Sequence, residues 1–370
     1  MKTCGLIVEY NPFHNGHIYH IEQAKKLTNC ECIIAVMSGN YCQRGIPAII
    51  DKHTRAKQAI KSGVNIVVEL PYIYATQSAS MFAKGAIDIL KLMNIDYLCF
   101  GSETNNLLEL IEIANTSINV DNLKEIMKTG ISYPKAYGIL ANQMGPNDIL
   151  ACAYLKQLHG TNIKPISIKR TIGYHDQQIS DISSASAIRN ALFNQDNIKN
   201  STPMKDILNN SELVFIDDIF PYVRHLLLTM PASKIAEIFM FSEGIENHLI
   251  KQAKKYYTYD DFIYNATTRR YTTSRINRCL LHLYNHITKD EVKNLGNITN
   301  ARIIAFDEIG QQYLKTLKAS GNIASNFEQY NQAYAQMELK TTYSYSNLLS
   351  SDNAEQIIKN ELRGAQKIVK

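Results

Sequence analysis

His14 and His17 lie three residues apart in the string EYNPFHNGH, residues 9–17. An apolar run at residues 3–9 precedes this string and an amphipathic pattern at 16–27 follows it, which predicts a turn from a strand into a helix. Such a turn presents free backbone N–H groups to phosphates, and its glycine lets a nucleotide approach the backbone. Two imidazoles at this spacing can donate hydrogen bonds to phosphoryl oxygens that gain charge during attack on phosphorus. The alternative is a pair of surface histidines in an ordinary loop.

A second phosphate-binding element is expected in the string ISSASAIR, residues 182–189. Hydroxyls of Ser184 and Ser186 and the amides at a helix start can hold phosphate oxygens, and Arg189 can neutralise their charge. The alternative is a serine-rich cap that opens a helix.

Together the two elements resemble the HIGH-type nucleotidyltransferase superfamily, whose members attack the α-phosphate of ATP and release pyrophosphate. Its second motif is Ser-Ser-Thr-x-Ile-Arg. Here Ala185 stands in place of the middle serine and Ser186 in place of the threonine, so not every hydroxyl contact carries over.

Longer strings give a narrower resemblance. They lie at residues 5–17, 37–45, 100–103, 145–150, 182–189 and 242–247. In this order they resemble the bacterial tRNA(Met) cytidine acetate ligase family. The resemblance implies activation of acetate by ATP as acetyl-adenylate. It further implies transfer of the acetyl group to the wobble cytidine of elongator tRNA(Met), giving N4-acetylcytidine.

The resemblance also implies roles for particular residues. His14 and His17 would be catalytic. The residues expected to bind ATP are Ile7, Val8, Glu9, Tyr10, Asn11, Pro12, Phe13, His14, Asn15, Gly16, His17, Gly101, Asn147, Arg170, Ser184, Ser186 and Arg189. For Asn147 the alternative is a helix cap, and for Arg170 a solvated strand end.

The loop at residues 38–45 follows a predicted strand and should reach the same edge of the sheet. Asn40, Gln43 and Arg44 are candidates to hold the small carboxylate or the departing phosphates, although an exposed turn would explain them nearly as well. A carboxylate is already ionised at pH 7, so its attack on ATP needs charge neutralisation and alignment more than a strong base. We therefore expect Mg²⁺ to accompany ATP, and no set of metal-ligating side chains is predicted.

Basic residues interleaved with tyrosines characterise the second half of the chain. Arg269, Arg270 and Arg275 are the candidates for tRNA binding, because such patterns neutralise a phosphate backbone and stack on unpaired bases. A solvated helical face would explain the basic residues almost as well.

The elements that must position these residues indicate an α/β fold. Strands are predicted at 3–9, 32–37, 64–69, 95–100 and 164–169, with helices at 16–27, 52–61, 79–93 and 184–193 between or after them. This alternation is typical of a Rossmann-like domain with a parallel sheet. We assign residues 1–195 to this ATP-binding catalytic domain and 205–370 to a mostly α-helical, tRNA-binding domain. A late strand is expected at 301–306.

Composition limits the functional classes. The net charge of +5 allows an anionic partner without demanding one, and no apolar stretch is long enough to span a membrane. Seven cysteines without a secretion signal favour free thiols in the cytoplasm. Two alternatives stay open: a small-molecule adenylyltransferase or acid–amine ligase of the same fold, and a non-catalytic RNA-binding protein that senses nucleotide. The oligomeric state is not predicted.

Overall fold

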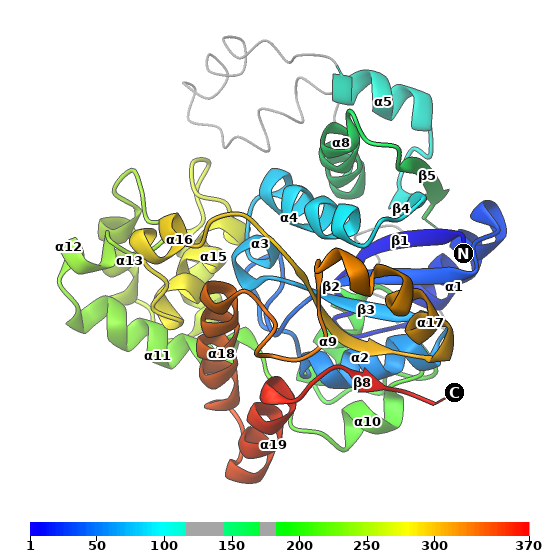
Figure 1. Ribbon diagram of the computed structural model, residues 1–370. Coiled ribbons are helices and arrows are strands. Elements are labelled where there is room, and N and C mark those ends of the chain that lie inside the picture. Colours follow the sequence, from blue (N-terminus) through cyan, green and yellow to red (C-terminus); the bar gives the residue numbers. More distant parts are fainter. Residues whose placement is uncertain (116–143, 171–182, 370) are drawn as a thin grey trace.

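A mixed sheet forms the centre of the protein. The structure, a computed structural model, describes residues 1–115, 144–170 and 183–369 (Figure 1). The strand order is β5-β4-β1-β2-β3-β6-β7, and β8 pairs with β6. Strands β1 to β5 are parallel to one another, and they correspond to the five strands predicted from the first half of the sequence. The prediction of an α/β fold with a parallel sheet is therefore confirmed.

The elements of the first half lie close to their predicted positions. They are β1 (Thr3–Val8), α1 (Asn15–Thr28), β2 (Cys32–Ser38), α2 (Lys52–Lys61), β3 (Ile66–Leu70), α3 (Tyr72–Ala75), α4 (Ala79–Leu92), β4 (Tyr97–Ser102), α5 (Leu107–Asn115), α8 (Pro146–Leu158), β5 (Lys164–Lys169) and α9 (Ala185–Phe193). Strand β4 begins two residues later than expected. The amide of Ile95 donates to the carbonyl of Leu90, so this residue still belongs to the connection from α4.

The second half is helical at first and then returns to the sheet. Its elements are α10 (Lys205–Asn209), α11 (Ile216–Thr229), α12 (Ala232–Ile235), α13 (Ile245–Ala253), α14 (Tyr259–Ala266), α15 (Thr273–Tyr284), α16 (Lys289–Asn294), β6 (Ala301–Phe306), α17 (Glu308–Leu317), η1 (Lys318–Ser320), β7 (Ile323–Ala324), α18 (Gln332–Ser346), α19 (Ser351–Leu362) and β8 (Gln366–Lys367). Strand β6 lies where a late strand was expected, and it pairs antiparallel with β3. The sheet therefore takes strands from both sides of the proposed 195–205 boundary.

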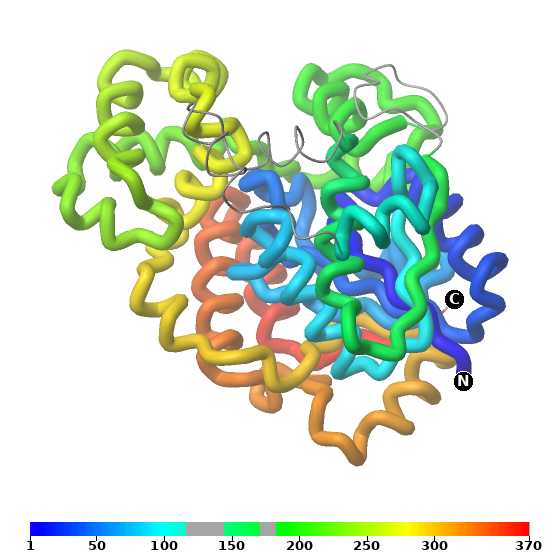
Figure 2. Tube along the Cα trace, turned by 90° about the horizontal axis from the view of Figure 1, so that it is seen from above, coloured from blue at the N-terminus to red at the C-terminus, as the bar shows by residue number. Residues whose placement is uncertain are grey.

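The period-2 alternation of buried strands divides the core into two layers. On β2, Ile34 and Val36 pack with α4 and α8, whereas Ile33 and Ala35 pack with α1, α2 and α9. Helices consequently cover both faces of the sheet, as a parallel sheet requires (Figure 1). Figure 2 shows helices α11 to α16, in green and yellow, gathered on one side of this core.

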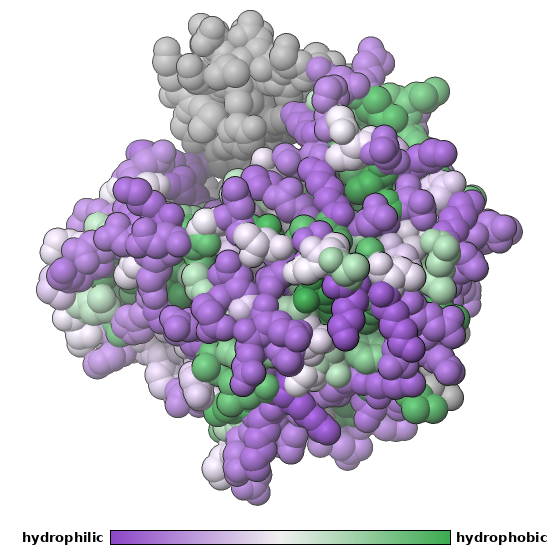
Figure 3. All heavy atoms as spheres, viewed as in Figure 1, coloured by the Kyte–Doolittle hydropathy of each residue, from purple (hydrophilic) through white to green (hydrophobic). Residues whose placement is uncertain are grey.

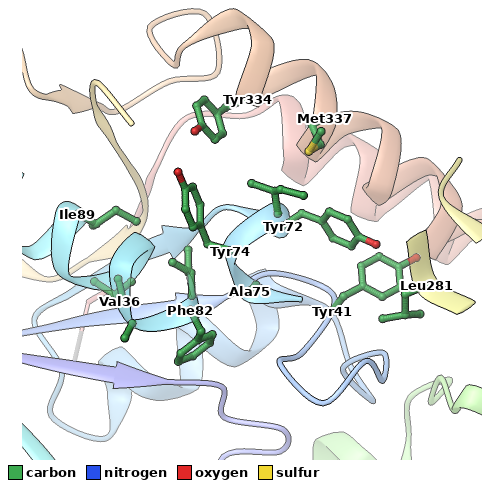
Figure 4. Close-up of a cluster of buried hydrophobic side chains, with 14 of the residues drawn as sticks. Val36, Tyr41, Tyr72, Tyr74, Ala75, Phe82, Ile89, Leu281, Tyr334 and Met337 are labelled. Carbon is green, nitrogen blue, oxygen red and sulfur yellow. The ribbon is translucent and has the colours of Figure 1, made fainter. Parts of the chain in front are cut away.

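Aromatic side chains join the helical part to the sheet. The ring of Tyr72 on α3 lies 5.5 Å from that of Tyr41, in the loop after β2. Figure 4 shows Leu281 of α15 next to Tyr41, with Tyr334 and Met337 of α18 above this cluster. The loop after β2 is thus packed against helices from the second half of the chain.

A buried ion network ties the C-terminal segment to the sheet. Lys52 of α2 pairs with Glu69 of β3 and, at 2.7 Å, with Glu361 of α19. Arg302 of β6 bridges the same two carboxylates at 2.8 and 2.5 Å. All four side chains are almost completely buried, so each charge is balanced only by its partners.

The surface carries the remaining charge. The face seen in Figure 3 is mainly hydrophilic with small, separate hydrophobic patches. No helix in the described ranges is long and apolar enough to cross a membrane. All seven cysteines are free, as predicted.

Candidate functional site

The two imidazoles of the β1–α1 turn are held by backbone amides. His14 is the N-cap of α1, and its Nδ1 accepts the amide N–H of Gly16 at 3.1 Å. The Nδ1 atom of His17 accepts the amide N–H of His14, also at 3.1 Å, and the ring centroids lie 3.7 Å apart. Because both Nδ1 atoms are acceptors, each neutral ring carries its proton on Nε2. The turn therefore offers two Nε2–H donors side by side.

Electrostatics keeps these rings neutral. Burial, and then the charges of Arg170 and Arg189, lower the pKa of His14 to about 3. Burial and the neighbouring His14 hold the pKa of His17 well below its usual value. At pH 7 both side chains are uncharged hydrogen-bond donors, while the positive charge of the site resides on arginines.

The turn itself is braced from two directions. Tyr10 has a left-handed backbone, with φ of 51°, and its ring lies 4.7 Å from both Phe13 and His17. From the segment after α9, the Thr202 hydroxyl donates to the carbonyl of Phe13 at 2.6 Å. These contacts fix the path of the chain just before the imidazoles.

The second predicted element lies against this turn. Arg189 of α9 donates through Nη1 to the carbonyl of Asn11 at 2.6 Å and through Nη2 to the Ser186 hydroxyl at 3.2 Å. Ser184 is the N-cap of α9, and its hydroxyl accepts the amide of Ala187 at 3.1 Å. The structure thus brings Arg189 to the turn that carries the histidines, whereas Ile182 of this string lies outside the described residues.

Gly101, Asn147 and Arg170 meet at the carboxyl ends of β4 and β5. Arg170 donates to the side-chain oxygen of Asn147 at 3.4 Å, and the Asn147 amide nitrogen donates to Glu103 at 2.5 Å. A Cβ on Gly101 would lie 3.3 Å from the side chain of Arg170, so glycine leaves room beside the guanidinium. These three predicted residues share one location, and Arg170 also influences His14 electrostatically.

The loop after β2 contributes unequally to this site. The amide of Gln43 donates to the Glu9 carboxylate at 2.7 Å. Burial lowers the pKa of Arg44, while Glu9, next in importance, opposes that shift. Asn40 is placed differently: its amide oxygen accepts the backbone N–H of Lys52 at 3.0 Å, and its amide nitrogen donates to Thr342 at 3.3 Å. Gln43 and Arg44 therefore lie near Glu9 at the β1–α1 turn, and Asn40 is engaged within the core.

The arginines expected to bind tRNA lie in the helical part. Arg269 and Arg270 precede α15 and are exposed, and Arg275 lies in its first turn. Arg270 and Arg275 pair with Glu243 at 3.4 and 3.2 Å. The structure does not bring these residues to the imidazoles.

Two residues at the site escaped the sequence analysis. Glu103 accepts hydrogen bonds from the backbone amides of Asn147 and Asp148 and so positions Asn147. This role is visible only in the structure, because the residues are 44 and 45 positions apart in the chain. His20 lies one helical turn beyond His17; burial and then Arg170 lower its pKa to about 4. The i, i+3 spacing of the three histidines was the available signal.

Comparisons with known proteins agree with this geometry. The family model described as HIGH Nucleotidyl Transferase matches residues 1–361. The chain is 34% identical to a tRNA(Met) cytidine acetate ligase of Oceanobacillus iheyensis, covering 98% of this chain and 99% of that one. It is 36% identical to the protein of the same name from Staphylococcus aureus, covering 94% and 95%.

Solved structures give the same result. Apo Thermotoga maritima TmcAL superposes with a TM-score of 0.90 at 30% identity, covering 100% of both chains. The same protein bound with alpha-thio ATP gives a TM-score of 0.89 at 29% identity. This chain therefore belongs to the HIGH nucleotidyltransferase family and, within it, to the family of the tRNA(Met) cytidine acetate ligases.

Proposed function

We propose that this protein is an ATP-dependent ligase that activates acetate as acetyl-adenylate and acetylates the wobble cytidine of elongator tRNA(Met) to N4-acetylcytidine. The names of its relatives and the ATP analogue bound by a structural neighbour support this proposal. The observation that carries it is the pair of neutral imidazoles, with Nε2–H donors, set among Arg170 and Arg189.

Charge at phosphorus explains why neutral donors suit the first step. An acetate oxygen attacks the α-phosphorus of ATP, the bond to the bridging oxygen breaks, and pyrophosphate leaves with that electron pair. Nε2–H groups of His14 and His17 donate to oxygens that gain negative charge in the transition state. Arg170, Arg189 and Arg44 neutralise the triphosphate without delivering a proton to it.

The second step transfers the acetyl group. The exocyclic amine of cytidine attacks the carbonyl carbon of the acetyl-adenylate, the bond from that carbon to the phosphate oxygen breaks, AMP leaves as an anion, and the amine gives up one proton to water. In the helical part, Arg269, Arg270 and Arg275 would neutralise the tRNA backbone. Such a substrate would place the protein in the cytoplasm.

Magnesium fits the site only in a supporting role. The described residues contain no group of three or more His, Cys, Asp or Glu side chains suited to hold a metal. Mg²⁺ prefers oxygen ligands and is usually bound by substrate phosphates together with one or two carboxylates. The Glu9 carboxylate, beside Arg44, would hold such an ion or its water; when bound, the ion supplies further charge neutralisation on pyrophosphate.

The two alternative functions receive less support. Similarity to the ligases covers the helical part as well as the nucleotide-binding sheet, and a small-molecule adenylyltransferase would have no need of that part. A pure nucleotide sensor would not need donors aligned for a transition state.

Incubation with ATP, labelled acetate and bulk tRNA tests the proposal. After digestion of the RNA, we expect label in N4-acetylcytidine of elongator tRNA(Met). The variant His14→Asn keeps an acceptor for the Gly16 amide but lacks the Nε2–H donor. We expect His14→Asn, His14→Ala and His17→Ala each to lower acetate-dependent exchange of pyrophosphate into ATP by ~10²-fold. Exchange at the wild-type rate in all three variants, or label confined to a small molecule, would refute the proposal.

A further inference from the structure

Arg278 connects two loops at the edge of the sheet. It lies on α15 and is 7% exposed. Its Nη1 donates to the carbonyl of Gln77 at 2.6 Å and to that of Gln43 at 3.4 Å. Gln43 belongs to the loop after β2, and Gln77 precedes α4 in the connection after β3. A guanidinium from the helical part thus stands where the carboxyl ends of β2 and β3 meet.

The charge of Arg278 has no counterion in the described part of the chain. Neither Nε nor Nη2 has a hydrogen-bond partner there, and Nε is buried. Burial lowers the pKa of Arg278 to about 10, so the side chain is still a cation at pH 7. Arg302, which is also buried, is paired with two carboxylates, and Arg275, one turn before Arg278, is paired with Glu243.

An unpaired buried charge is unfavourable for folding, because the guanidinium loses its hydration without gaining an ion pair. The two bonds to carbonyls occupy one nitrogen only. The side of the guanidinium formed by Nε and Nη2 matches the two oxygens of a carboxylate, and it has no partner within residues 1–115, 144–170 and 183–369. Such an arrangement is expected where a ligand supplies the missing anion.

The guanidinium of Arg278 lies close to the residues of the proposed reaction. The side chain of Gln43 donates to the Gln77 carbonyl at 2.9 Å, and its backbone amide donates to Glu9 at the β1–α1 turn. The phosphate-binding cations come from other elements: Arg170 follows β5 and donates to Asn147, and Arg189 of α9 donates to the Asn11 carbonyl of that turn. The acid must approach the α-phosphate opposite the departing pyrophosphate, which calls for a separate cation.

We propose that Arg278 binds the carboxylate of the acid substrate through its Nε and Nη2 edge. This proposal rests on the function proposed above. The triphosphate has its own cations, and a guanidinium that is 7% exposed suits a small acid better than an RNA backbone. Arg278 thereby becomes a residue of the acid site supplied by the helical part of the chain.

Steady-state kinetics of acetate-dependent pyrophosphate exchange tests this assignment. Arg278→Gln keeps an amide donor for the two carbonyls but removes the charge; we expect the KM for acetate to rise by ~10²-fold. Arg278→Lys keeps the charge but loses the planar edge, and we expect a rise of at least ~10-fold. The KM for ATP should change by less than about threefold in both variants.

Arg363→Gln is the matched control, because it removes the same charge from an exposed position after α19; its kinetics should equal those of the wild type. Acetate should also raise the thermal unfolding midpoint of the wild type and not that of Arg278→Gln.

A raised KM for ATP or tRNA with an unchanged KM for acetate would overturn the assignment. So would a large fall in the unfolding midpoint of both variants without acetate, which would make the guanidinium a structural cross-link. Absence of exchange in the wild type would instead contradict the proposed function, and the acetate-induced shift would then decide on Arg278 separately.

Discussion

At the β1–α1 turn the imidazoles supply neutral hydrogen-bond donors and the guanidiniums supply the positive charge. His14 and His17 use their Nδ1 atoms to accept backbone amides, which fixes the tautomer and the direction of both rings. The nearby arginines hold the positive charge and lower the pKa of His14. Had these rings been protonated, each would have lost its backbone acceptor and the turn would have lost two hydrogen bonds. The sequence motif is therefore as much a folding motif as a candidate catalytic one.

His282 lies away from this turn, and burial lowers its pKa in the same way. The effect on this residue can be measured through the pH dependence of the unfolding free energy. Burial, and then Arg278, lower the pKa of His282 to about 3, and the ring lies 3.2 Å from the Tyr72 hydroxyl. Between pH 6.5 and about 3 the unfolded state binds a proton that the folded state does not, so stability falls as the pH falls. We expect His282→Gln to reduce the pH dependence of the unfolding free energy near pH 5 by about 1.4 kcal/mol per pH unit. Urea unfolding at several pH values measures this; equal slopes in both proteins would contradict it.

At the scale of elements, the loop after β2 depends on α15. Gly45 has a φ of 78°, and a Cβ there would overlap the backbone at Asn277 and Arg278. Gly244 has the same φ of 78° but nothing within 4 Å of the position of a Cβ. Alanine at Gly244 therefore tests backbone strain alone, whereas alanine at Gly45 tests the same strain together with a steric clash against α15.

We expect Gly244→Ala to cost about 1 kcal/mol of stability, the ordinary cost of a left-handed alanine. Gly45→Ala should cost an additional ~1–3 kcal/mol, because either the loop or α15 must move. It should also slow pyrophosphate exchange, since Gln43 and Arg44 belong to the same loop. Urea unfolding and the exchange assay measure both effects, and equal losses of stability in the two variants would show that α15 does not restrain the loop.

At the scale of the whole molecule, buried ion pairs link the C-terminal helix α19 to the central sheet and to α2. Lys52 and Arg302 face Glu69 and Glu361, and the four residues come from α2, β6, β3 and α19. Glu338 of α18 lies near them and accepts the amide of Tyr72 at 2.7 Å. Burial, and then Glu69, raise the pKa of Glu338 to about 8, so this group is largely neutral at pH 7 and the two cations balance two carboxylates.

Arg302→Met should break this balance. Two carboxylates would share a single buried cation, and we expect the unfolding free energy to fall by ~3–5 kcal/mol. Lys359→Met is the control, because Lys359 pairs with Glu355 on the exposed face of α19 and should not change stability measurably. Chemical denaturation compares the two variants, and similar stabilities would mean that the network contributes little to holding the C-terminal segment.

Local sequence patterns determined the positions of most strands and helices in the first half of this protein. Apolar runs and amphipathic periods located the five parallel strands and the helices between them, because these elements depend on neighbouring residues and on burial of one face or both. The spacing of His14, Gly16 and His17 next to a strand end predicted, for the same reason, the turn from β1 into α1 that the structure shows. Strand β6 was expected, but its pairing with β3 was not, since pairing depends on contacts between residues far apart in the chain.

Tertiary structure alone decided the environment of each side chain. Asn40 and Gln43 are three residues apart in one loop, yet Asn40 bonds to Lys52 and Thr342 in the core while Gln43 faces Glu9. In the sequence Arg278 is one of several basic residues around one helix, and only the fold shows it buried with no counterion among the described residues. Charge and hydrogen bonding act through space, so a sequence names the groups that can do chemistry but not their partners.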